Sequence, residues 1–171
     1  QILWINMSTA VLLGLMLAFE PRETDIMKRP PRDPNRPMLT REMVSRIFFV
    51  GFLMLVGGFG LFEVAEWRGL AVERARTIAV NVFIFVEIVY LFNSRSLRQP
   101  AWRIGLFTNP WIFVGTAVMI ALQLLYTYLP LANRIFQSAP ITWGDWVQIL
   151  LYAVAVYGLV ELAKARRRRA G

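Results

Sequence analysis

Residues 2–19 read ILWINMSTAVLLGLMLAF, a run of eighteen residues without a single charged side chain. At 1.5 Å per residue, a helix of this length is about 27 Å long, close to the roughly 30 Å hydrocarbon core of a bilayer. The run therefore predicts a helix that crosses a membrane. Its polar side chains, Asn6, Ser8 and Thr9, lie within about one helical turn.

Four more apolar runs follow, at residues 43–65, 77–92, 111–128 and 143–162, and we expect each to span the membrane. Thr40 is the predicted N-cap of the second run, and Asn109 with Pro110 opens the fourth. Pro130 ends the fourth run, and residues 129–142 link it to the fifth. The pattern predicts an all-α fold, a polytopic transmembrane bundle of five spans.

Composition supports a membrane protein over a soluble one with five buried core helices. Hydrophobic residues make up 57% of the chain and charged residues only 18%, whereas soluble domains carry about 25% charged residues. The glycines at 57, 58 and 60 in the second run allow close approach of a neighbouring helix. Cys and His are both absent, which excludes disulfides, thiol nucleophiles, imidazole bases and the usual zinc sites.

The net charge of +8 is explained by membrane topology and requires no nucleic acid. Fifteen of the 19 basic residues lie in the first link with its flank, the third link and the tail. These segments should be cytoplasmic, so we expect a cytoplasmic loop at 20–42, a cytoplasmic tail at 163–171 and an external Gln1. The chain opens on apolar residues without an initiator Met, and we expect it to be a piece of a longer protein of a bacterial or archaeal cell membrane.

Glu87 is the clearest candidate for a functional residue, because an ionisable group deep in a membrane span costs a few kcal/mol and is therefore a functional candidate by default. Asn6 and Thr9 are three residues apart and predict an oxygen-bearing helix face that could ligate a cation. The alternatives are a protonated Glu87 bonded to a neighbouring helix and hydrogen bonds between helices for Asn6 and Thr9. Solvation at span ends accounts for the other acids, Glu63, Glu66 and Glu161, while Asn81 and Gln123 are single amides and weak signals.

Three stretches carry a resemblance to a known family. Residues 1–21, QILWINMSTAVLLGLMLAFEP, and residues 25–37, DIMKRPPRDPNRP, resemble the sixth helix and the following cytoplasmic loop of P-type cation-transporting ATPases. Residues 87–94, EIVYLFNS, resemble the eighth helix of these pumps. The likeness covers essentially the whole chain and is greatest to the calcium-pump and sodium-potassium-pump types. This resemblance implies that the chain supplies helices six to ten of a ten-helix membrane domain.

The resemblance implies an ATP-driven cation pump whose ion site includes Asn6, Thr9 and Glu87 as metal ligands. Ala10 stands where calcium and sodium pumps hold an aspartate, so the ion stays open: calcium, sodium, potassium, a proton or another. No catalytic residue, phosphorylated Asp-Lys-Thr-Gly motif or cofactor site is expected in this chain. The parent is expected to use ATP and Mg²⁺.

The expected partners are membrane lipid, the transported cation, and the N-terminal transmembrane and cytoplasmic ATPase domains of the same parent chain, with no nucleic acid. The competing hypothesis is a non-catalytic membrane scaffold or a small channel-like helical protein that ligates no ion of its own.

Overall fold

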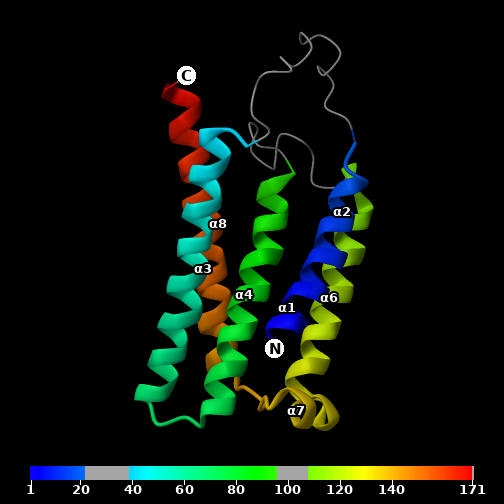
Figure 1. Cartoon of the computed structure of the whole chain (residues 1–171), viewed down its shortest axis with the longest axis vertical. Helices are drawn as coiled ribbons and strands as arrows, with labels where there is room; N and C mark the ends of the chain where they lie inside the picture. Colours follow the sequence, from blue (N-terminus) through cyan, green and yellow to red (C-terminus); the bar gives the residue numbers. More distant parts are fainter. Residues whose placement is uncertain (22–38, 96–107, 171) are drawn as a thin grey trace.

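The computed structural model describes residues 1–21, 39–95 and 108–170, and every regular element in this part of the chain is a helix (Figure 1). The predicted all-α fold class is confirmed. Four helices are long and apolar enough to cross a membrane, and the apolar first run, Ile2–Ala18, is shorter. The loop motif at 25–37 and Pro100 lie outside the described residues.

The first run forms three consecutive helical pieces, α1 (Ile2–Ser8), η1 (Thr9–Leu13) and α2 (Gly14–Ala18). The middle piece is a π-helix, because the backbone N–H of Gly14 donates to the carbonyl of Thr9, five residues earlier. Such a wide turn is rare and is often found at functional sites. The sequence predicted a helix here but not this turn.

The second and third runs form α3 (Arg41–Trp67) and α4 (Val72–Ser94), joined at Gly69, which has a φ of 72°. Thr40 caps α3 as predicted, since its hydroxyl accepts from the backbone N–H of Met43 at 3.3 Å. A Cβ atom added at Gly57 or Gly58 would lie 2.1 Å from the Tyr152 ring or 2.7 Å from the Phe83 ring. Those two glycines permit close packing, as predicted. A Cβ atom at Gly60 would meet nothing within 4 Å, so no described helix packs closely there.

The remaining helices are α6 (Pro110–Tyr128), α7 (Pro130–Phe136) and α8 (Trp143–Ala170). Asn109 with Pro110 opens α6 as predicted, and the Asn109 side chain also caps the helix by accepting from the N–H of Trp111 at 3.1 Å. The link at 129–142 contains the short helix α7. Pro130 ends α6 but also occupies the first turn of α7, where a missing N–H costs no hydrogen bond.

Successive spans run in opposite directions (Figure 1). We call the end that holds Gln1, Gly69 and α7 the lower end, and the end that holds Glu20 and Arg95 the upper end. The α4 helix is central and packs on two apolar clusters: one it shares with α3 and α8, the other with the first run and α6. Many large apolar side chains on the outside of the bundle stay exposed, as expected for surfaces that face lipid.

Polar contacts fix both ends of α4. At the upper end, the Arg95 side chain is fully buried and donates to Glu20 Oε1 at 2.8 Å and to Thr108 Oγ1 at 2.6 Å. Asn109 Nδ2 donates to the same Glu20 carboxylate at 2.9 Å. At the lower end, Arg74 pairs with Asp145 at 2.7 Å. These contacts tie α4 to α2, α6 and α8.

Candidate functional site

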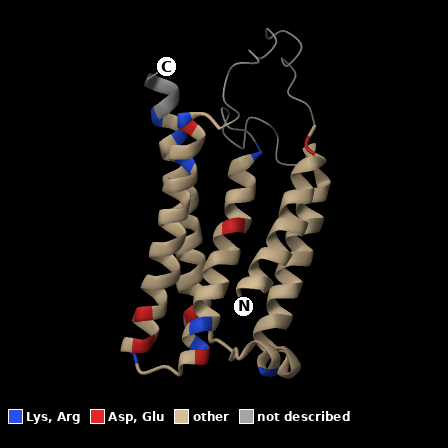
Figure 2. Cartoon of the chain, viewed as in Figure 1, with Lys and Arg blue, Asp and Glu red and all other residues tan. Residues whose placement is uncertain are grey.

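Glu87 lies midway along α4 and contributes an acid where the bundle is otherwise apolar. Figure 2 shows charged residues gathered at the two ends of the helices, with acidic colour interrupting the middle of α4. The Glu87 carboxyl is partly buried, and its Oε2 atom is buried without a hydrogen-bond partner among the described residues. An acid in this position either carries a proton or needs a cation as its partner.

The hydroxyl of Thr9, at the start of the π-helix, lies close to the Glu87 carboxyl. That hydroxyl also donates to the carbonyl of Ile5 at 2.8 Å. Because a hydroxyl rotates, Thr9 can donate to the Ile5 carbonyl and accept from a protonated Glu87 carboxyl, or it can turn and donate to an ionised Glu87 carboxylate. A cation bound at Glu87 would meet the Thr9 oxygen only while the Thr9 proton points to Ile5.

The other two positions on the first run face away from the described helices. Asn6 and Ala10 are both exposed, whereas Thr9 is buried. The structure therefore brings Thr9 and Glu87 together and leaves Asn6 on an open face of α1. The spacing of three residues between Asn6 and Thr9 did not reveal that one faces α4 and the other faces outward.

No group of three or more His, Cys, Asp or Glu side chains that could hold a metal ion occurs in the described residues. Ala10 on the first run contributes no carboxylate to a site at Glu87. A calcium ion takes six to eight oxygen ligands. The described residues near Glu87 supply only part of such a set.

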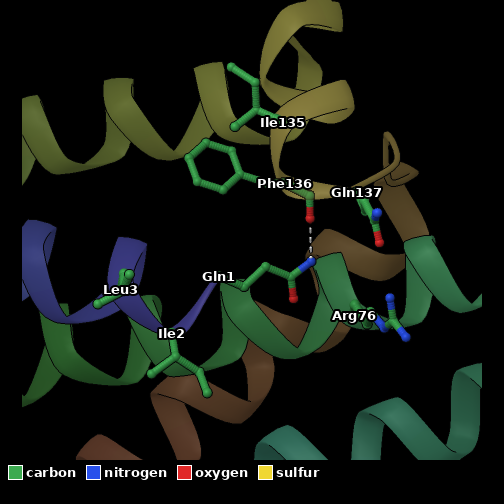
Figure 3. A pocket seen from close by; sticks show the side chains of 7 residues that line it. All are labelled: Gln1, Ile2, Leu3, Arg76, Ile135, Phe136 and Gln137. Atoms are coloured by element: carbon green, nitrogen blue, oxygen red, sulfur yellow. Dashed lines mark hydrogen bonds between the residues drawn. The ribbon is translucent and has the colours of Figure 1, made fainter.

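A pocket of about 500 Å³ opens at the lower end (Figure 3). Gln1 forms one wall, where its side-chain amide donates to the Phe136 carbonyl at 2.8 Å. The lining contains no acid, and its one charged side chain is Arg76. This pocket does not have the chemistry of a cation site.

Glu161 differs from the sequence-based interpretation, which explained it by solvation. Its side chain is buried and pairs with Lys164 at 3.0 Å, three residues further along α8. Lys164 also donates to the backbone carbonyl of Asn93 at the end of α4. The lysine therefore balances the charge of this acid inside the bundle, although the second oxygen, Oε2, has no hydrogen-bond partner among the described residues. Glu63 and Glu66 are exposed, as solvation at the span end predicts.

The sequence-based interpretation treated Asn81 and Gln123 as weak signals, but both make contacts between helices. Both side chains are fully buried. Asn81 Nδ2 donates to Thr127 Oγ1 on α6 at 3.2 Å, and Gln123 Oε1 accepts from the indole of Trp4 on α1 at 3.1 Å. The usable signal was the spacing of four residues between Gln123 and Thr127, which places two polar groups on one face of an otherwise apolar helix.

The family described as "Cation transporting ATPase, C-terminus" matches residues 1–166 of this chain. The chain belongs to that family. Its four long apolar helices and the shorter apolar first run fit a multi-pass membrane region of such an ATPase.

Relatives of this ATPase region come from several bacteria. It is 49% identical over 156 residues to the probable cation-transporting ATPase F of Mycobacterium tuberculosis, an alignment that covers 91% of this chain and 17% of the relative. It is 30% identical over 171 residues to the cation-transporting ATPase pma1 of Synechocystis, covering 95% and 19%. It is 30% identical over 151 residues to the calcium-transporting ATPase of Bacillus subtilis, covering 88% and 17%. The chain thus spans less than a fifth of these relatives' length.

Proposed function

We propose that the chain is the C-terminal half of the membrane domain of an ATP-driven cation pump, and that Glu87, Thr9 and Asn6 contribute ligands to its transport site. The observation that carries this proposal is the Glu87 carboxyl inside the bundle, with a buried unpartnered oxygen and the Thr9 hydroxyl beside it. The ATP-binding and phosphorylation parts, with Mg²⁺, belong to the rest of the parent chain. The names of the relatives support this coupling of ATP to cation movement.

The proposed ligands on this chain favour an ion that needs few negatively charged ligands. One carboxylate, one hydroxyl and one amide oxygen fall short of the coordination of a hard divalent cation, and Ala10 adds no anion. Asn6 lies on an exposed face of α1, so it would meet ligands from helices that precede residue 1 in the parent. We therefore propose an unspecified cation, with a calcium-like site ranked below it.

The charge distribution supports an orientation in which the upper end is cytoplasmic. Basic residues of the first link, the third link and the tail belong to that end. Residues 20–42 and 163–171 would then lie in the cytoplasm, with Gln1 on the outside. A bacterial cell membrane is the proposed location, supported by the Mycobacterium relative at 49% identity.

The full-length parent protein offers a direct test through cation-dependent phosphoenzyme formation. We expect Glu87→Gln to remove the dependence or to shift the half-saturating cation concentration by tenfold or more, since it deletes the one charge among the three ligands proposed on this chain. Thr9→Val and Asn6→Ala should give smaller shifts, because each removes one neutral oxygen. Glu66→Gln is the matched control, an exposed acid at the end of α3, and should leave the dependence unchanged.

Unchanged cation dependence in Glu87→Gln, Thr9→Val and Asn6→Ala alike would contradict the site. A separate result would contradict the pump assignment itself: the unsubstituted parent protein forms no phosphoenzyme under any cation. A non-catalytic scaffold or channel-like protein would then be the better description.

A further inference from the structure

A buried polar cluster lies between α1, α4 and α6 in the lower half of the bundle. It comprises Trp4, Asn81, Gln123, Tyr126 and Thr127. All but Trp4 are at most 1% exposed. None of these residues belongs to the proposed ion site.

The orientation of both amides in the cluster is fixed by their partners. The Trp4 indole N–H only donates, so the Gln123 atom that meets it at 3.1 Å must be the oxygen. The backbone carbonyl of Thr77 only accepts, so the Asn81 atom that meets it at 2.8 Å must be the nitrogen. Asn81 is therefore left with an unpaired oxygen, and Gln123 with an unpaired NH₂ group.

Three polar atoms of the cluster have no hydrogen-bond partner in the described part of the chain: Asn81 Oδ1, Gln123 Nε2 and the Tyr126 hydroxyl. Each is buried to the point that no solvent reaches it. Helices elsewhere in the parent cannot pair with atoms already enclosed by α1, α4 and α6. The partner must be small enough to lie inside the bundle.

We propose that this cluster is a closed binding site for water, distinct from the cation site. A water molecule can accept from Gln123 Nε2 and donate to Asn81 Oδ1 or to the Tyr126 hydroxyl, which matches the three unpaired atoms in number and in polarity. A metal cation is disfavoured, because the Gln123 NH₂ group would point its positive hydrogens at the ion.

The cluster is closed toward the lower pocket by three aromatic rings. Trp4 stacks on Tyr126 at 5.6 Å between ring centroids, and Phe136 lies 5.3 Å from each of them. Phe136 also lines the lower pocket (Figure 3). Bound water would therefore exchange slowly, and through Gln123 and Trp4 it would help hold the lower half of the first run, just before the turn that carries Thr9.

Radiolytic hydroxyl labelling of the full-length protein in ¹⁸O water tests the site, because bound water generates radicals at the residues it touches. We expect Tyr126 to be labelled at least several-fold faster than Met119. Met119 is the internal control, since it is equally buried on the same helix but carries no hydroxyl or amide that could hold water, and methionine oxidises readily. Tyr126 labelling no faster than that of Met119 would overturn the proposal.

A variant and a titration separate water from a cation. Asn81→Leu with Gln123→Leu should lower Tyr126 labelling to the Met119 level, and Asn81→Leu alone serves if the double variant does not fold. Sodium, potassium or calcium added in turn to the Glu87→Gln protein should leave Tyr126 labelling unchanged; protection by any of them would mean a cation site. The titration uses a protein that lacks the Glu87 charge, so its result does not depend on the proposed cation site. The water site can therefore be wrong while the proposed pump function is right, and the pump function can be wrong while the water site is right.

Discussion

The neighbouring helices α3 and α4 are both long and apolar enough to cross a membrane, but only 17% of the α3 span is buried, against 56% of the α4 span. The α3 helix contacts the bundle through shape, with Gly57 and Gly58 admitting aromatic rings from α8 and α4. The α4 helix is held by directional polar contacts at both ends and carries Glu87. In this bundle α4, which is surrounded by protein, holds the candidate site residue Glu87. The α3 helix, which is mostly exposed, presents apolar side chains on its surface.

Removal of the arginine at the upper end of α4 is expected to have the largest effect. Arg95→Met leaves the Glu20 carboxylate without its buried cation, and breaking such a pair costs about 3–5 kcal/mol. The measurement is the thermal unfolding midpoint of the full-length protein in nanodiscs. Arg68→Met, an exposed arginine that follows α3, is the control and should leave the midpoint unchanged. Equal midpoints for both variants would show that polar contacts do not distinguish the two helices.

Gly57→Ala should have an intermediate effect on α3. The added methyl group would lie 2.1 Å from the Tyr152 ring, whose hydroxyl donates to the Leu53 carbonyl at 2.6 Å. Overpacking of this kind costs about 1–3 kcal/mol, measured as a lower unfolding midpoint in the same nanodiscs. Gly60→Ala, with nothing within 4 Å, should be neutral or slightly stabilising because alanine favours helix. A destabilised Gly60→Ala protein would contradict packing as the cause.

The smallest effect is expected on the lipid-facing surface of α3. Phe48 is 75% exposed, so Phe48→Leu keeps an apolar surface and should change stability by less than about 0.5 kcal/mol. Ile84→Val on α4, at a fully buried position, should cost about 0.5–1.5 kcal/mol. Thermal unfolding of both variants checks the ranking. A larger loss from Phe48→Leu than from Ile84→Val would reverse the contrast between the helices.

The sequence predicted what depends on local chemistry. Apolar length identified the helical runs, and the cap at Thr40 followed from a side chain that accepts a backbone N–H bond. The resemblance to cation pumps was confirmed by the family match. The exact limits of the membrane spans and the ligand roles of Asn6, Thr9 and Glu87 stay predictions.

What the sequence did not predict depends on which faces meet. The burial of Glu161 follows from its ion pair with Lys164 and from the packing of α8 on α4. The meeting of Asn81 with Thr127 joins residues 46 positions apart and leaves no local pattern. Asn6 and Thr9 share a spacing of three residues, yet only the assembled bundle separates the outward amide from the inward hydroxyl.

The wide turn at Thr9–Leu13 has a mechanical consequence for the first run. A π-turn holds one residue more than the α-helical turn it replaces. When such a turn moves along the helix by one position, the residue it passes rotates about the axis by roughly 100° while both ends of the helix stay in place. Such a shift would exchange the side chain of the first run that faces Glu87 without sliding the helix through its neighbours.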